Sequence, residues 1–203
     1  MKTPAFFLAS ITLGLLITSC ITSPNPFYTE RDIFQDDRIL GDYAEGNTED
    51  CSAIRKDPDH SEHYILRYYR KQHPEKWIEL AATLFRVGTN SYVDLFPVDE
   101  SSFEHIPGVP PSGMDVIRNI MHQPLHALAR ISINDKGVAL SFPQQRSLAK
   151  LVEQYPSFTN YVRQESMLLL PQSSNELHAL LAKEGQSLFP DPTDFKKPKV
   201  PSK

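Results

Sequence analysis

Short runs in which apolar and polar residues alternate dominate the chain from about residue 38 to residue 142. Such alternation, rich in β-branched and aromatic residues and interrupted by turn-forming residues, is typical of strands in an antiparallel sheet. The sequence Asn-Asp-Lys-Gly at 134–137 predicts a tight hairpin turn, because these residues tolerate its backbone angles. Strands are predicted at 38–43, 51–55, 62–69, 77–87, 91–96, 125–133 and 138–142.

The pattern changes after residue 143. Apolar residues then recur three or four positions apart, which predicts an amphipathic helix over 144–155. A short apolar strand is predicted at 166–170. A second helix is predicted to begin with a capping box formed by Ser173 and Glu176, and to stop at Gly185.

About eight short strands, joined mostly by hairpins, predict a mainly β fold. We expect an antiparallel lipocalin-like barrel or a strongly curved sheet, with two C-terminal helices. Gly41-Asp42-Tyr43 loosely resembles the lipocalin Gly-x-Trp motif, with Tyr in place of Trp. Residues 31–190 are predicted to form a single β-rich domain, followed by a flexible tail at 191–203. The stretch 97–120 contains four prolines and predicts a long loop, for which a contact surface and a plain insertion both stay open.

The first twenty residues have the pattern of an export signal. Lys2 is followed by an uncharged run from Ala5 to Ile17, shorter than the roughly 20 apolar residues of a membrane-spanning helix. The sequence Ile-Thr-Ser-Cys that ends this run resembles the lipobox of bacterial lipoproteins, with an aliphatic residue, two small residues and a cysteine. The resemblance implies that residues 1–19 are a signal peptide cut between Ser19 and Cys20. It also implies that lipid on the Cys20 thiol anchors the mature chain; an ordinary secretory signal is the weaker alternative.

The residues after the cysteine bear on location. Residues 20–30 contain two prolines and predict a short tether between the lipid and the domain. In enteric lipoproteins an Asp directly after the cysteine retains the protein at the inner membrane, and this chain has Ile21 there. We therefore expect a lipid-anchored protein of the cell envelope, at the outer membrane if the source is Gram-negative.

The mature part is also similar to a set of uncharacterised bacterial lipoproteins. The similarity covers most of residues 25–197, apart from 99–120, and it implies fold and location without implying any chemistry. The matching segments are Asn25–Tyr28, Leu40–Tyr43, Tyr92–Pro97, Pro124–His126 and Ser173–Leu177.

The composition of the chain limits the classes of molecule that it is expected to bind. The 203 residues are 40% hydrophobic and carry a net charge of −4, which is typical of a globular protein and lacks the basic excess of a nucleic-acid-binding surface. If Cys20 carries lipid, Cys51 has no cysteine partner, so no disulfide framework is expected. Glu49 and Asp50 beside Cys51 oppose thiolate formation, which favours a half-buried strand position for it.

Candidate chemistry is sparse. No nucleophile elbow, phosphate-binding loop or metalloprotease motif occurs, so we expect no enzyme activity, no catalytic residue and no cofactor. His122 and His126 flank Pro124, which disfavours a helix, and on a strand they lie about 13 Å apart. We therefore expect no metal site, and predict that His126 pairs with a carboxylate or a backbone group. Asp94, inside an apolar strand, is predicted to make structural hydrogen bonds or to point into a barrel lumen.

Two functional hypotheses stay open. In the first, a barrel holds a small apolar ligand; in the second, an envelope protein-protein interaction module acts without ligand or catalysis. A hollow apolar interior would favour the first hypothesis and a packed interior the second. The predicted ligand-binding residues are Tyr64, Tyr68, Trp77, Tyr92, Asp94 and His126.

Overall fold

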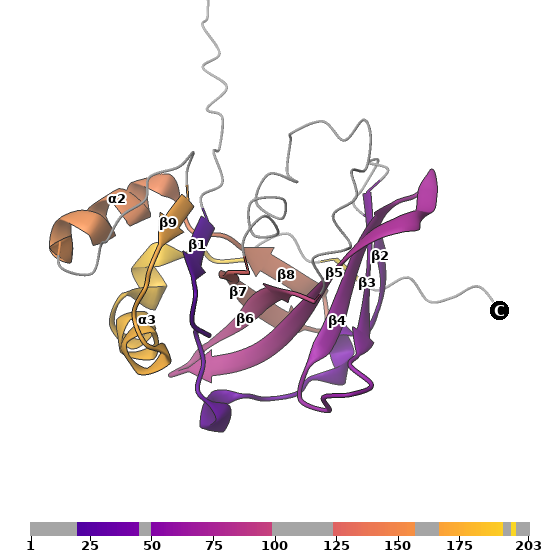
Figure 1. Ribbon diagram of the computed structural model, residues 1–203, viewed down its shortest axis with the longest axis horizontal. Coiled ribbons are helices and arrows are strands. Elements are labelled where there is room, and N and C mark those ends of the chain that lie inside the picture. The colour runs from indigo at the N-terminus through magenta and orange to yellow at the C-terminus, as the bar shows by residue number, and fades with distance from the viewer. Residues whose placement is uncertain (1–19, 45–49, 99–123, 157–166, 193–195, 198–203) are drawn as a thin grey trace, which may run out of the picture.

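The chain forms one mixed, mostly antiparallel sheet with two helices near its C-terminus (Figure 1). The computed structural model describes residues 20–44, 50–98, 124–156, 167–192 and 196–197. The strands of this part are β1 (Cys20–Ser23), β2 (Gly41–Ala44), β3 (Asp50–Lys56), β4 (Tyr64–Arg70), β5 (His73–Val87), β6 (Asn90–Pro97), β7 (His126–Asn134), β8 (Gly137–Ser141) and β9 (Met167–Leu169). The helices are α2 (Gln145–Gln154) and α3 (Ser174–Leu188), with short 3-10 turns η1 (Glu30–Asp32) and η2 (Asp37–Ile39).

Most predicted elements are confirmed to within a few residues. The first predicted strand, 38–43, is instead divided between η2 and β2, because the Asp36 side chain accepts a hydrogen bond from the Arg38 amide and caps a helical turn. The second helix continues past its predicted stop through Leu188. The predicted signal peptide and nearly all of the predicted 97–120 loop lie outside the described residues.

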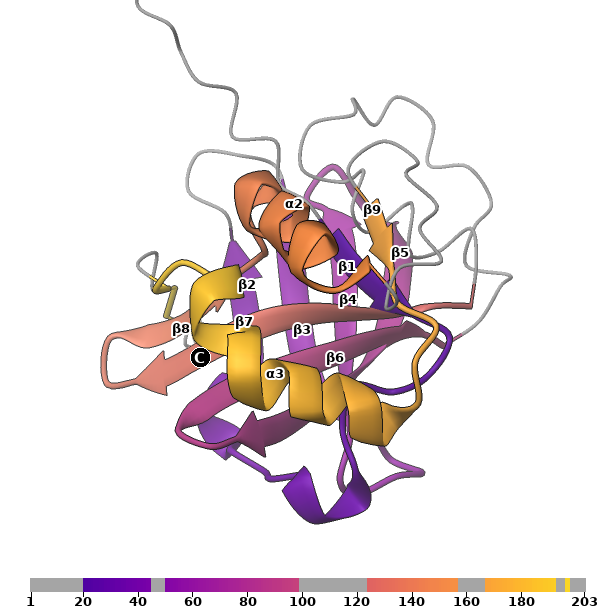
Figure 2. The ribbon, with the colours of Figure 1, turned by 90° about the vertical axis from the view of Figure 1, so that its left-hand side faces the viewer.

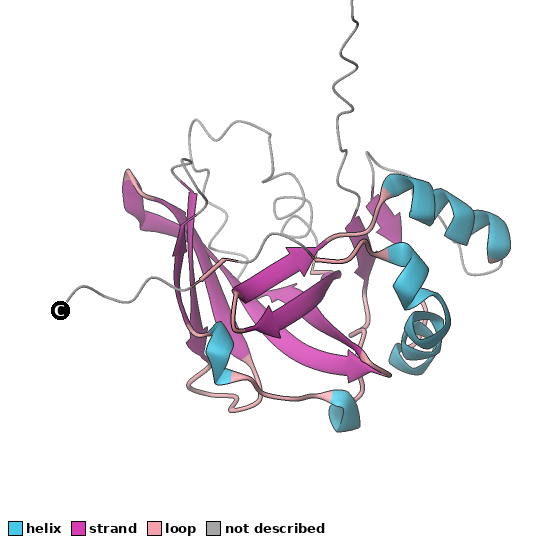
Figure 3. Ribbon diagram, turned by 180° about the vertical axis from the view of Figure 1, so that it is seen from behind, coloured by secondary structure: helices cyan, strands magenta, loops and turns pink. Residues whose placement is uncertain are grey.

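The predicted barrel or strongly curved sheet is wrong, because the observed sheet is neither closed nor strongly curled. Its strand order is β2-β3-β4-β5-β6-β7-β1-β9, with β8 paired to β7 outside this path. A barrel requires its first and last strands to pair, whereas β2 and β9 end the order separately. Figure 3 shows the sheet from behind, open between these ends.

The sheet divides at β7, because two different strands pair with the same edge of this strand. One edge pairs with β6, and the opposite edge pairs with β1 around Leu128 and with β8 from Arg130 onward. Strands β1 and β8 therefore lie end to end along a single edge of β7. The parallel pairing of β9 with β1 then extends the sheet at one of these positions only.

The predicted tether is also wrong in its first residues. Cys20–Ser23 is a strand between β7 and β9 with all four residues buried, and the backbone of Leu170 donates to the carbonyl of Thr22 at 2.8 Å. Further along, Phe27 is 1% exposed. Tertiary pairing satisfies the backbone groups of this segment, so it joins the domain despite its two prolines.

Both faces of the central strands are buried. On one face, β5 contributes Leu80 and Leu84 to a core that extends across β2 to β8. On the other face, Phe85 and Tyr92 lie beneath α2 and α3, and Figure 2 shows both helices on this side of the sheet. None of the helices in the described ranges has the length and apolar character needed to cross a membrane.

Gly185 lies inside α3 rather than at its end, and close packing explains why glycine is needed there. A Cβ atom built at this position would lie 2.2 Å from the Tyr92 hydroxyl oxygen. The absence of a side chain at Gly185 thus allows the helix to approach a fully buried tyrosine on the sheet.

We expect Gly185→Ala to destabilise the fold by about 1–3 kcal/mol, because the added methyl group overlaps the Tyr92 hydroxyl. Urea unfolding would measure the loss, with Tyr92→Phe as the matched background that removes the hydroxyl. The loss should be clearly smaller in that background; an equal loss in both would show that the close approach is not its cause.

Candidate functional site

Cys20, the predicted lipidation residue, is the first residue of β1 and is only 4% exposed. Burial raises the pKa of its thiol to about 12, so almost none of it is thiolate at neutral pH. Because the thiolate is the nucleophilic form, the predicted acylation of Cys20 would require a state in which this end of β1 has not entered the sheet. Ser19, on the other side of the predicted cleavage, lies outside the described residues.

The predicted aromatic ligand contacts do not surround a common cavity. Tyr64 and Tyr92 are 1% and 0% exposed and belong to the cores on opposite faces of the sheet. Tyr68 is half-buried against the first core. Trp77 is 40% exposed at the surface, and the guanidinium carbon of Arg67 lies 4.9 Å from its ring centroid. The lumen in which these side chains were expected to meet does not form in the open sheet.

Asp94 and His126 do come together. The His126 Nδ1 atom lies 2.7 Å from Asp94 Oδ1, and the backbone amide of Phe27 donates to Asp94 Oδ2 at 2.9 Å. Asp94 is 2% exposed, and the ring of Phe96 lies 4.4 Å from the His126 ring, centroid to centroid. The predicted pairing of His126 with a carboxylate and the predicted hydrogen-bonding role of Asp94 are both confirmed.

This arrangement has a clear physical role. A buried carboxylate is tolerated only when hydrogen bonds replace its hydration. The two oxygens of Asp94 bind the histidine of β7 and the amide that follows β1, so β6 is tied to two segments distant in sequence. His122 lies outside the described residues, and within the described ranges no group of three or more His, Cys, Asp or Glu residues could hold a metal ion.

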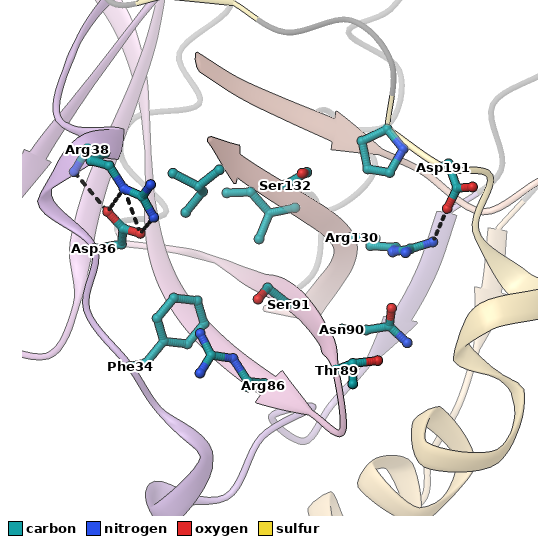
Figure 4. A pocket seen from close by; sticks show the side chains of 13 residues that line it. Phe34, Asp36, Arg38, Arg86, Thr89, Asn90, Ser91, Arg130, Ser132 and Asp191 are labelled. Atoms are coloured by element: carbon teal, nitrogen blue, oxygen red, sulfur yellow. Dashed lines mark hydrogen bonds and ion pairs between the residues drawn. The ribbon is translucent and has the colours of Figure 1, made fainter. Parts of the chain in front are cut away.

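A polar cleft of about 340 Å³ lies beside the end of β7 (Figure 4). The last pairing between β6 and β7 joins Ser91 to Ile131, and β7 continues to Asn134 beside β8. The cleft occupies the space next to this extension. Its lining comprises Phe34, Asp36, Arg38, Arg86, Thr89, Asn90, Ser91, Arg130, Ile131, Ser132, Ile133, Asp191 and Pro192.

Three guanidinium groups and two carboxylates give the cleft its electrostatic character. Arg38 holds Asp36 at two points, with Nε–Oδ1 at 2.9 Å and Nη2–Oδ2 at 2.6 Å. This hydrogen bonding is the main reason why the pKa of Asp36 lies below its ordinary value. Arg130 donates from Nη1 to Asp191 Oδ1 at 3.0 Å. The guanidinium carbon of Arg86 lies 4.6 Å from the Phe34 ring centroid.

The sequence analysis did not single out these arginines, although a signal for Arg86 was present. On β5 it occupies the same face as Leu80 and Leu84, both fully buried, so a charged residue interrupts an apolar face. Arg130 likewise interrupts the apolar run of β7. The approach of the 34–38 segment and Asp191 to these positions depends on long-range packing, which the local pattern does not encode.

Comparison with protein-family models, with curated protein sequences and with solved structures finds no match for this chain.

We expect Asp94→Ala to destabilise the fold by about 3 kcal/mol, because it leaves the Phe27 amide and His126 without their buried acceptor. Denaturant unfolding would measure the change. Asp37→Ala is the matched control, because Asp37 forms an exposed pair with Lys56, and it should change stability by about 0.5 kcal/mol or less. Equal effects of the two substitutions would contradict the structural role of Asp94.

In the folded chain with residues 1–19 present, we expect Cys51 to react with iodoacetamide well before Cys20. At pH 8 a thiol with the pKa of Cys20 is thiolate in only about one molecule in ten thousand, and its side chain is buried, whereas Cys51 is half-buried on β3. Peptide mass spectrometry over time would give both rates. The difference should vanish in urea; faster labelling of Cys20 under native conditions would contradict its burial.

Proposed function

We propose that this protein is a lipoprotein of the bacterial cell envelope, tethered to a membrane by lipid on Cys20. The lipobox-like sequence at residues 17–20, directly after an apolar run too short to span a bilayer, is the observation that carries the proposal. One acyl chain gives only marginal membrane binding, so stable anchoring by this route needs two or more chains.

The buried position of Cys20 sets a condition on this proposal. A diacylglycerol group on Sγ does not fit among core side chains, which are close-packed. We infer that acylation takes place while Cys20 is outside the sheet, and that the mature chain keeps the acylated Cys20 outside the core. The remaining residues of β1, Ile21–Ser23, retain their register with His126–Leu128 on β7, so the lipid would lie directly at the edge of the domain.

For the domain itself we favour an envelope interaction module over a carrier of an apolar ligand. Two of the aromatic residues expected to line a ligand cavity, Tyr64 and Tyr92, are instead fully buried core residues. The cleft among the described residues is lined mainly by polar and charged side chains, whereas sites for apolar ligands are lined mainly by apolar ones. These observations favour binding through polar surface groups.

We expect Cys20→Ser to abolish lipid attachment and membrane association, because a hydroxyl does not replace the thiol nucleophile. Expression in a Gram-negative host with radiolabelled palmitate, followed by membrane fractionation and intact-mass measurement, would test this. Cys51→Ser is the matched control and should retain label, acyl mass and membrane location.

Wild-type protein that retains residues 1–19 and carries no acyl mass would refute the anchor. Label that persists in Cys20→Ser and disappears in Cys51→Ser would move the lipid to the other cysteine. Both outcomes are readable from the same two variants and the wild type.

A further inference from the structure

The polar cleft beside β7 contains one arginine, Arg86, that forms no ion pair within the described part of the chain. Arg38 and Arg130 each hold a carboxylate, from Asp36 and Asp191 respectively. Arg86 is exposed. The pKa of Asp36 is lowered mainly by its hydrogen bonds with Arg38 and to a smaller extent by the charge of Arg86, but Arg86 and Asp36 form no ion pair. The Arg86 guanidinium instead contacts the face of Phe34, which leaves the N–H groups at its edge able to donate to another molecule.

The partners of Arg38 and Arg130 indicate which chemical groups bind to the arginines of this cleft. The guanidinium of Arg38 binds the Asp36 carboxylate through two parallel hydrogen bonds, a geometry that both carboxylates and phosphates can form with arginine. The Asp191 carboxylate is 78% exposed while the Arg130 side chain is 13% exposed. An exposed carboxylate of the chain itself thus already pairs with one arginine of the cleft.

Neutral hydrogen-bonding groups accompany Arg86. Ser91 is its direct partner in the β5–β6 hairpin, and Thr89, Asn90 and Ser132 also line the cleft. Figure 4 shows Ser91 between Arg86 and Ser132, with Thr89 and Asn90 on the adjoining turn. Hydroxyl and amide groups can bind the remaining oxygens of an anion, and about 340 Å³ is within the size range of small-molecule sites.

We propose that this cleft binds a small ligand through an oxyanion group, a carboxylate or a phosphate, with Arg86 as its principal contact. The phenyl ring of Phe34 holds the guanidinium plane in place, and the side chains of the β5–β6 turn and of β7 orient the anion. This site is separate from the lipid anchor, and its test does not depend on acylation at Cys20.

Isothermal titration calorimetry of the full chain with citrate and with inorganic phosphate tests the proposal. We expect at least one probe to bind, and Arg86→Gln to weaken that binding at least tenfold, because a charge-assisted pair is lost. Arg55→Gln is the matched control, since it removes the same charge from an exposed pair with Asp42 on β2 and β3. It should leave the affinity unchanged.

Asp191→Asn provides a change in the opposite direction. It releases Arg130 from its carboxylate while leaving the overall fold intact, because Asp191 is mostly exposed, and we expect it to tighten binding severalfold. Binding of citrate alone would identify a carboxylate ligand, and binding of phosphate alone a phosphate ligand. The proposal is overturned if neither probe binds, if Arg86→Gln binds like the wild type, or if Arg86→Gln and Arg55→Gln weaken binding equally.

Discussion

Strand β7 pairs with β1 over its first residues and with β8 over its last, and the rest of the architecture depends on this shared edge. The β1 half admits the parallel strand β9, from which the chain proceeds into α3. The β8 half extends past the end of β6, and the polar cleft lies beside that extension. From β7 the sheet continues through β1 to β9, which does not pair with β2, and the sheet is therefore open.

The central strands are covered on both faces, so their side chains must be mostly apolar on both faces. Leu80 and Leu84 face one core, and Phe85 and Tyr92 face the helices. A charged residue in such a position needs a dedicated partner, and Asp94 has two, the His126 ring and the Phe27 amide. The same carboxylate that would weaken an apolar face thus fastens the N-terminal segment across the sheet. On the side covered by the helices, the absence of a side chain at Gly185 leaves the space that the Tyr92 hydroxyl occupies.

The two functional proposals concern different parts of the molecule and different chemistry. The proposed anchor rests on a sequence signal at the end of the predicted export segment, and the burial of Cys20 adds the condition that acylation would have to take place while Cys20 is outside the sheet. The proposal of an anion site in the cleft rests on geometry alone, because arginines from η2, β5 and β7 line one space. A domain held at a membrane by lipid on Cys20 would present such a cleft to small acidic molecules.

Local pattern in the sequence was enough to predict nearly all the strands, both helices and the hairpin at 134–137, because side-chain alternation and turn chemistry act over a few residues. The same pattern predicted that Asp94 and His126 would need partners, since a buried polar group needs a hydrogen bond whichever part of the chain supplies it. Only the tertiary structure decided that they partner each other, that Cys20–Ser23 joins the sheet, that the sheet stays open and that three arginines share a cleft. Each of these depends on contacts between residues far apart in sequence, such as the pairing of Ile21 with Leu128, and a local pattern of side chains does not encode such contacts.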